Sequence, residues 1–193
     1  MKRISVFCAS SIGNNPIYRK TAYDVGVFLA QNKVGVVYGG SHLGLMGAVA
    51  QGALDNDGEV IGVLPHFMSS REIAHNKLTE LIMVDSMHDR KLKMYELSDG
   101  IIALPGGFGT FEELFEMLTW AQLGLHQEPI GVLNVNGYYD HLLSMIDHMN
   151  AEGLLKDSNA KMVLQAEKIE ILHQQMLEYQ PDMKAVTIRK DQT

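Results

Sequence analysis

The sequence is poor in cysteine and in positive charge, and both shortages exclude classes of protein. Cys8 is the only cysteine among 193 residues, so no disulfide can form within one chain, and we expect a small buried thiol in a reducing compartment. Lys and Arg number 16 against 23 Asp and Glu, which gives a formal net charge of −7. Because nucleic-acid backbone is bound by Lys and Arg that neutralise its phosphates, we expect no nucleic-acid partner.

The sequence also lacks long apolar runs and metal-binding patterns. Residues 4–9 form an apolar run after Lys2 and Arg3, but this run is too short for the core of a secretory signal. No stretch approaches the roughly 18 apolar residues of a membrane span, so we expect a cytoplasmic protein with no membrane partner. The histidines show neither HxxH nor HExxH spacing, and the sequence therefore predicts no metal site.

What the sequence does have is a regular alternation of short β-branched runs and longer stretches with helical periodicity. Strands are expected at residues 4–9, 34–38, 59–64, 81–84, 101–104 and 130–133, with a short edge strand at 162–164. Helices are expected at residues 16–29, 43–55, 87–98, 111–123, 139–150 and 168–179. This order predicts an α/β fold, a Rossmann-like doubly wound parallel sheet of about six to seven strands with helices on both faces. We expect one nucleotide-binding domain over residues 1–193, with a loose tail from about residue 180.

A first glycine cluster follows an expected strand, at the sheet edge where parallel sheets bind ligands. It runs from Gly39 and Gly40 to Gly47, and Ser10 follows the strand before it. Glycine lets a ligand approach main-chain N–H groups, and a helix start adds unpaired donors and the positive end of a dipole, so this segment favours an anion. Ser41 is the expected cap of that helix. A tight strand–helix turn without a ligand explains the same residues.

A second cluster, Pro-Gly-Gly-Phe-Gly-Thr-Phe-Glu-Glu at residues 105–113, repeats this arrangement after another strand. It is not a Walker loop, because no Gly-Lys-Ser/Thr follows. It is not the dinucleotide fingerprint, since Glu112 stands where that pattern needs glycine or alanine. Two separate glycine turns at one sheet edge favour a monophosphate over a pyrophosphate.

Two interpretations of Glu113 stay open. Thr110 and Glu113 fit a capping box, in which a Thr and a Glu three residues later satisfy each other's backbone donors. The first turn of a helix also faces whatever the preceding loop holds, so this carboxylate could lie beside a ribose C1′. There it would stabilise oxocarbenium charge, attack as a nucleophile or activate water.

Arg90 and Lys91, in an expected helix, also leave two interpretations. They could form a solvated pair on the helix surface. Alternatively, Arg90 could hold phosphate or carboxylate oxygens in a fork, with Lys91 adding a point charge. The adjacent cations are more informative in an acidic chain than in a basic one. Met46 and Met87 are candidate pocket linings.

Two motifs at fixed spacing indicate a family. Residues 105–113 match Pro-Gly-Gly-x-Gly-Thr-x-x-Glu, and residues 87–91 match Met-His-x-Arg-Lys. Further matching stretches lie at residues 38–47, 118–124 and 131–139. From residue 4 to residue 139 the chain thereby resembles the LONELY GUY family of cytokinin-activating phosphoribohydrolases, which were long labelled lysine decarboxylases.

The resemblance implies hydrolysis of an N6-substituted AMP to a free base, a cytokinin or adenine, and ribose 5-phosphate. It implies Arg90 and Glu113 as the catalytic pair, and a homodimer or larger homo-oligomer with sites near the subunit interface. The residues that it assigns to substrate binding are Ser10, Gly39, Gly40, Glu72, Arg90, Lys91, Gly106, Gly107, Phe108, Gly109, Thr110, Phe111, Glu112 and Thr119. Two positions depart from the family pattern: Ala9 replaces a glycine, and Glu96 stands where plant members have a second arginine.

Two other functions explain part of the same pattern. A non-catalytic nucleotide-binding or carrier protein would have the same glycine turns and the same capping box. Lysine decarboxylation normally needs pyridoxal phosphate on a Schiff-base lysine, and the chain is short for that architecture. We therefore expect no cofactor.

Overall fold

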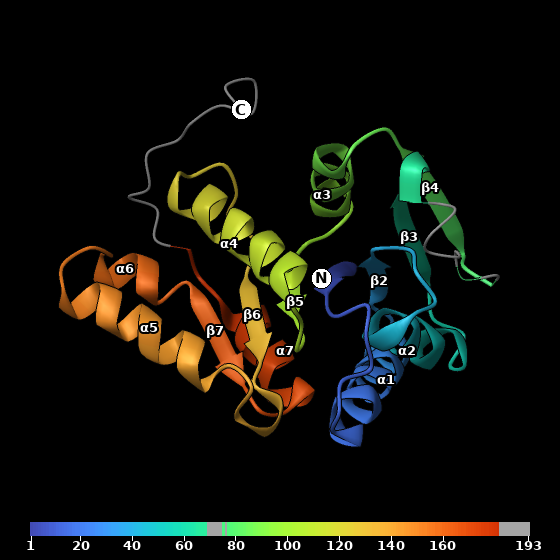
Figure 1. Ribbon diagram of the computed structural model, residues 1–193, viewed down its shortest axis with the longest axis horizontal. Helices are drawn as coiled ribbons and strands as arrows, with labels where there is room; N and C mark the ends of the chain where they lie inside the picture. Colours follow the sequence, from blue (N-terminus) through green and yellow to red (C-terminus); the bar gives the residue numbers. More distant parts are fainter. Residues whose placement is uncertain (69–74, 76, 182–193) are drawn as a thin grey trace.

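The computed structural model describes residues 1–68, 75 and 77–181, and these residues form a seven-stranded sheet. Neighbouring strands are parallel throughout, in the order β4-β3-β2-β1-β5-β6-β7 (Figure 1). The strands are β1 (Arg3–Phe7), β2 (Gly35–Tyr38), β3 (Val60–Pro65), β4 (Glu80–Val84), β5 (Ile101–Ala103), β6 (Ile130–Leu133) and β7 (Val163–Ala166). The predicted doubly wound parallel sheet is thereby confirmed. Glu72, and almost all of the tail expected from about residue 180, lie outside the described residues.

Helices cover both faces of the sheet (Figure 1). They are α1 (Pro16–Gln31), α2 (Gly44–Leu54), α3 (Met87–Glu96), α4 (Phe108–Gln122), α5 (Asp140–Ala151), α6 (Asp157–Ala160) and α7 (Ile169–Glu178), with 3₁₀ turns at η1 (His66–Met68) and η2 (Val135–Gly137). The sequence did not predict α6 or the 3₁₀ turns, because such short pieces show no period. None of the described helices is long and apolar enough to cross a membrane.

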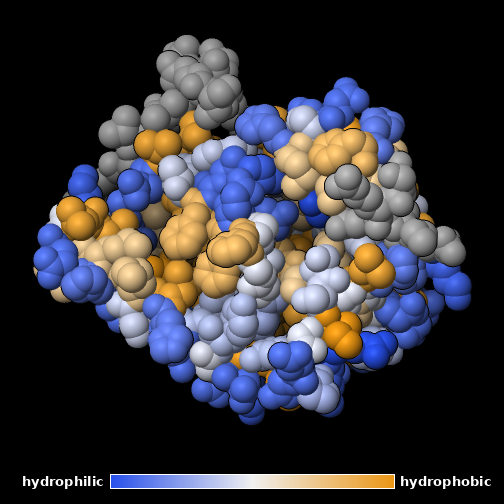
Figure 2. Space-filling view, viewed as in Figure 1, coloured by the Kyte–Doolittle hydropathy of each residue, from blue (hydrophilic) through white to orange (hydrophobic). Residues whose placement is uncertain are grey.

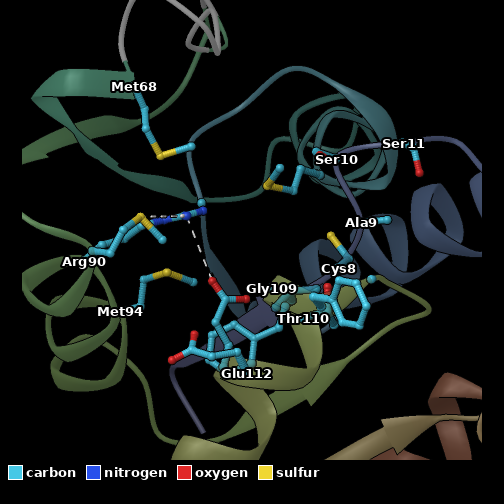
Figure 3. Close-up of a pocket in the computed structure, with 18 residues that line it drawn as sticks. Cys8, Ala9, Ser10, Ser11, Met68, Arg90, Met94, Gly109, Thr110 and Glu112 are labelled. Atoms are coloured by element: carbon cyan, nitrogen blue, oxygen red, sulfur yellow. Dashed lines mark hydrogen bonds and ion pairs between the residues drawn. The ribbon is translucent and has the colours of Figure 1, made fainter.

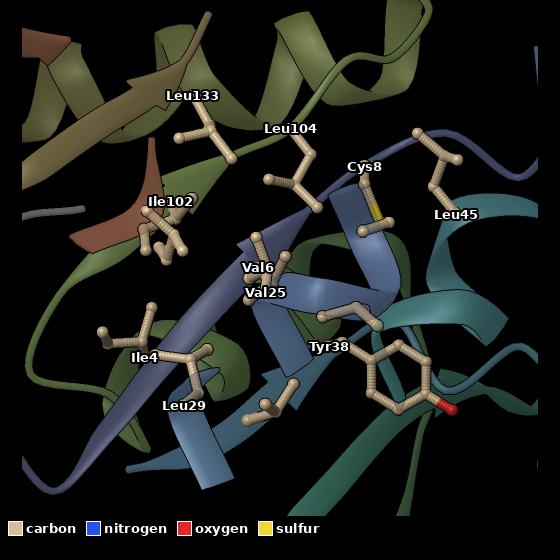
Figure 4. Close-up of a cluster of buried hydrophobic side chains, with 14 of the residues drawn as sticks. Ile4, Val6, Cys8, Val25, Leu29, Tyr38, Leu45, Ile102, Leu104 and Leu133 are labelled. Carbon is tan, nitrogen blue, oxygen red and sulfur yellow. The ribbon is translucent and has the colours of Figure 1, made fainter. Parts of the chain in front are cut away.

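Strand alternation divides the core into two layers. Ile4 and Val6 of β1 point into a cluster with α1, α2 and α7, whereas Phe7 points into a cluster with α3, α4 and the start of α5. Figure 4 shows the first cluster, where Leu29 of α1 packs over β1. Burying one such aliphatic side chain stabilises the fold by about 1.5–3 kcal/mol. This packing therefore fixes the positions of the strand ends from which the loops begin.

The strand order creates a place for a ligand between β1 and β5. From β1 the chain passes to β2, β3 and β4 on one side, and it then returns to β5 on the other side of β1. The helix that follows β1 packs on one face of the sheet and the helix that follows β5 packs on the opposite face. The two loops therefore separate beyond the strand ends and leave a crevice there.

Candidate active site

A cavity of about 370 Å³ opens at the carboxyl ends of β1, β2 and β5. Figure 2 shows this hollow near the middle of the molecular face, with apolar surface on both sides of it. Its wall comes from the turn after β1, the residue after β2, one side of α3 and the first turns of α4 (Figure 3). The residues proposed from the sequence that lie on this wall are Ser10, Gly39, Arg90, Gly107, Phe108, Gly109, Thr110, Glu112 and Glu113.

The start of α4 forms the anion-attracting part of the wall. Gly107 is the N-cap, α4 begins at Phe108, and the first backbone bond of the helix runs from Phe111 N to Gly107 O at 3.1 Å. The N–H groups of residues 108–110 precede that bond, so they have no partner within the helix, and they lie at the positive end of its dipole. A Cβ added at Gly107 or Gly109 would meet nothing within 4 Å. This space in front of the donors is open to a ligand.

Two tyrosines after β6 hold the loop that leads into α4. Tyr138 Oη donates to the carbonyl of Gly106 at 2.5 Å, and Tyr139 Oη donates to the carbonyl of Leu104 at 2.6 Å. A Cβ at Gly106 would overlap the Thr110 side chain, so glycine is required for that packing. These two hydrogen bonds therefore hold the loop in place, and the backbone N–H groups at the start of α4 keep one orientation.

Glu113 lies in the second turn of α4 and not in a capping box. Of the two interpretations of Glu113, the capping box is wrong, because α4 begins at Phe108, which places Thr110 inside the first turn, and no side chain caps the helix. The Glu113 side chain instead lines the cavity and is 8% exposed as a residue. Burial raises the pKa of this carboxyl to about 7, although Arg90 opposes the rise.

Arg90 reaches the cavity from α3, a helix that Ser86 caps by accepting from Asp89 N at 3.0 Å. Arg90 Nη1 lies 4.0 Å from Glu113 Oε1, which is an ion pair without a hydrogen bond (Figure 3). The guanidinium lies so close to the backbone of Gly39 that a Cβ there would overlap its Nη2 atom. Buried Arg90 Nε has no hydrogen-bond partner among the described residues. The guanidinium therefore has donor capacity left for a ligand.

The first glycine loop differs from the expectation, because the protein itself uses its helix donors. Leu45 N and Met46 N both donate to the carbonyl of Ala9, at 3.0 and 3.3 Å. Ser41 does not cap α2. The N-cap is Leu43, whose N–H donates to Ser41 Oγ at 3.0 Å in the turn ahead of the helix. The start of α4 is therefore the better anion site of the two.

Lys91 and Glu112 bind each other. Lys91 Nζ lies 2.5 Å from Glu112 Oε1 and 2.9 Å from Glu116 Oε2. Burial alone would lower the pKa of Lys91, but the hydrogen bonds to these two carboxylates leave it above its ordinary value. Glu112 still borders the cavity, whereas Lys91 is not among the residues that line it in the described part of the chain. Of the two interpretations of Arg90 and Lys91, the solvated surface pair is thus wrong, because both side chains are buried.

Other residues assigned by resemblance lie off the cavity wall. The Phe111 ring packs against Tyr139, with ring centroids 5.8 Å apart. Thr119 Oγ1 donates to a carbonyl of its own helix at 2.7 Å. Gly40 has a φ of +79°, which accounts for glycine at this turn without a ligand. Glu72 falls outside the described residues, and its role stays a prediction.

Sequence reasoning named Met46 and Met87 as candidate linings, and both lie on the cavity wall, but it missed Met68 and Met94. Met94 follows Arg90 by four residues on α3, so helical spacing alone could have placed it there. Met68 comes from η1, which gave no signal. Cys8, expected as a core thiol, is buried and also borders the cavity, and burial raises its pKa well above the ordinary value. Among the side chains described, no three His, Cys, Asp or Glu residues could share a metal ion.

Comparison with known proteins assigns the family. A family model described as "Possible lysine decarboxylase" matches residues 46–176. The cytokinin riboside 5′-monophosphate phosphoribohydrolase LOG7 of Arabidopsis thaliana is 42% identical over 186 residues, which cover 96% of this chain and 86% of the relative. The chain belongs to the LONELY GUY (LOG) family. The resemblance inferred from the two motifs is thereby confirmed.

Another LOG relative agrees, and solved structures show the same fold. The rice (Oryza sativa subsp. japonica) protein named "Probable cytokinin riboside 5′-monophosphate phosphoribohydrolase LOGL3" is 44% identical over 180 residues, 93% of this chain and 85% of the relative. A Moco carrier protein of Chlamydomonas reinhardtii has a TM-score of 0.69 at 20% identity and covers 91% of this chain and 97% of its own. The molybdenum cofactor binding protein of Rippkaea orientalis has a TM-score of 0.66 at 22% identity, with coverages of 91% and 93%. At these identities the structural likeness shows the fold alone.

Proposed function

We propose that this LOG-family chain is a phosphoribohydrolase, which cleaves the N-glycosidic bond of a nucleoside 5′-monophosphate to give a free base and ribose 5-phosphate. Curated relatives of that name are 42% identical over nearly the whole chain. One structural observation carries the proposal: the buried Glu113 carboxylate lies 4.0 Å from Arg90 on the wall of a cavity that also includes the first turn of α4. The proposed substrates are AMP and its N6-substituted forms.

The phosphate would bind at the start of α4. Its oxygens accept from the N–H groups of residues 108–110, which have no partner within the helix, and the open space at Gly107 and Gly109 lets them approach. The Thr110 side chain also lines this part of the cavity. Glu113 lies one helical turn further along α4, so a phosphate held here directs the ribose toward that carboxylate.

Cleavage breaks the C1′–N bond and leaves positive charge on C1′ and the ring oxygen. An ionised Glu113 stabilises this charge at short range, whether it acts by electrostatics, as a nucleophile or by taking a proton from water. Water supplies the hydroxyl that ends on C1′, and the base leaves with a proton. Arg90 lies beside the carboxylate and favours its charged form. Its guanidinium borders the cavity, so it is placed to interact with a bound nucleotide.

The test is product release from AMP and from N6-isopentenyl-AMP, followed by chromatography of the base. The wild-type protein should release base and ribose 5-phosphate, and Glu113→Gln should bind nucleotide but release no base. Glu167→Gln, at an exposed glutamate outside the cavity, is the matched control and should keep the wild-type rate. Binding without any turnover by the wild-type protein would instead make it a nucleotide carrier.

The assembly proposed with this function is a homodimer or larger homo-oligomer in the cytoplasm. Phe108 supports an association near the cavity, because its side chain lies on the cavity wall and yet is 97% exposed in the single chain. Light scattering after gel filtration should give at least twice the mass of 21.5 kDa. A mass of one chain at all concentrations would contradict this part of the proposal.

A further inference from the structure

Lys91 is a buried cation at the contact between α3 and α4. Its side chain is 9% exposed, and its Nζ atom is bound by Glu112 at 2.5 Å and by Glu116 at 2.9 Å. Both carboxylates belong to α4, one helical turn apart. The resemblance assigned Lys91 to substrate, but its charge is already used between two helices of this chain. This arrangement points to a different role.

The same two helices hold the proposed catalytic pair. Arg90 precedes Lys91 on α3, and Glu113 follows Glu112 on α4. Arg90 and Glu113 are 4.0 Å apart, which is too long for a hydrogen bond. This pair therefore does little by itself to hold its two side chains in a fixed relative orientation. The hydrogen bond from Lys91 to Glu112 supplies a directional contact between α3 and α4, and the ion pair of Lys91 with Glu116 adds charge attraction.

We propose that Lys91 is a positioning residue, which binds Glu112 and Glu116 and so fixes α4 against α3 at the separation that places Arg90 opposite Glu113. The expected fall in kcat rests on the proposed hydrolase function. The role of Lys91 in fixing α4 against α3 does not depend on that function. In this account Lys91 does not bind the phosphate. The first turn of α4 would hold the phosphate without Lys91.

The charges around Glu113 give this role a signature. Glu112 and Glu116 on α4 raise the pKa of Glu113, whereas Arg90 and Lys91 on α3 lower it. The Cys8 thiol, directly after β1, also faces the group, and burial keeps that thiol protonated. Removing Lys91 therefore leaves two uncompensated carboxylates beside Glu113 and should raise its pKa further. Removing Glu116 should shift the same pKa downward.

The experiment compares Lys91→Met, Lys91→Arg and Glu116→Gln with the wild-type protein. Five quantities are measured: kcat and KM for AMP, inhibition by inorganic phosphate, the pH profile of kcat/KM, and the Glu113 titration followed by NMR of carboxyl-labelled glutamate. Unchanged amide spectra establish folding. A crystal structure of Lys91→Met needs no turnover, so it tests the positioning role even if the protein releases no base and the proposed function fails. An Arg90–Glu113 distance that moves away from 4.0 Å is expected, and an unchanged distance would overturn the role.

In Lys91→Met we expect kcat to fall roughly tenfold or more, because a small displacement of reacting groups is costly. The inhibition constant of phosphate should stay within about twofold of wild type, and the acidic limb of the pH profile should move to higher pH. Lys91→Arg should restore most of kcat, and Glu116→Gln should move the limb to lower pH.

A different result would assign Lys91 to the phosphate. In that case Lys91→Met would weaken phosphate inhibition roughly tenfold or more and raise the KM for AMP, with little change in kcat. An unchanged kcat in Lys91→Met would also overturn the positioning role. If Lys91→Met does not fold, a kcat lowered roughly tenfold in Glu116→Gln at unchanged phosphate inhibition supports the proposal, and a wild-type kcat there overturns it.

Discussion

Glu113→Gln should make the protein more stable while it abolishes catalysis. The Glu113 carboxyl is buried, and burial raises its pKa from 4.5 to about 7. Glutamine has nearly the same shape as the neutral carboxyl, so the variant keeps the packing of the protonated state and never has to bury a charge. The perturbation therefore isolates the free energy of holding an ionised carboxylate in the cavity.

The magnitude follows from linkage. A carboxyl whose pKa is higher in the folded state favours folding most below the unfolded pKa, and this advantage is lost as pH rises from about 4.5 through about 7. At roughly 1.4 kcal/mol per pKa unit, the rise corresponds to about 3 kcal/mol. Glu113→Gln should thus exceed wild type in unfolding free energy by about 3 kcal/mol at pH 8.5 and by about 1 kcal/mol or less at pH 5.

The assay is urea unfolding of both proteins at these two pH values, with linear extrapolation to water. Glu167→Gln serves as the control, because Glu167 is exposed, and its difference from wild type should not grow with pH. Equal stability of Glu113→Gln and wild type at pH 8.5 would refute the reasoning. It would mean that the Glu113 carboxylate is hydrated in the folded protein and carries no strain from burial.

Three further predictions concern the same site. The kcat/KM for AMP should fall by about tenfold per pH unit below a pH of about 7, because Glu113 then becomes protonated, and a limb near pH 4.5 would contradict this. Gly39→Ala should lower kcat/KM by on the order of 10²-fold at unchanged fold, since the added methyl overlaps the Arg90 guanidinium, and wild-type kinetics would show that Arg90 sits elsewhere. Gly109→Ala should leave the unfolding free energy unchanged or raise it by up to about 1 kcal/mol. It should weaken AMP binding, measured by calorimetry, because its methyl group would enter open cavity space. An unchanged affinity for AMP would place the phosphate away from α4.

The spacing of apolar residues was sufficient to predict the fold, because this spacing defines the face that most helices and strands bury. Most strands read as continuous apolar runs, and all seven strands of the described sheet were found within one or two residues of their predicted ends. The start of α4 was the informative failure. Thr110 and Glu113 have capping-box spacing, but the helix accepts Phe108 and Gly109 in its first turn, so the true start lies three residues earlier. Sequence spacing cannot distinguish the two starts.

The candidate site was predictable only in part, for a similar reason. Glycine clusters and the Arg90 and Glu113 motifs predicted the sheet edge at which the cavity opens, because parallel strands bring their carboxyl ends together. Which of the two glycine loops can bind an anion depends on the Ala9 carbonyl, which accepts from the backbone N–H donors at the start of α2. The pairing of Lys91 with Glu116 depends on how α3 lies against α4. Both are tertiary contacts that no local pattern encodes.

A crystal structure of Glu113→Gln with AMP would test the central claim most directly. We predict that the phosphate accepts from the N–H groups of Gly109 and Thr110, and that C1′ of the ribose lies in contact with the side chain at position 113, on the side that faces Arg90. A phosphate bound at α2, or a ribose turned away from position 113, would contradict the account.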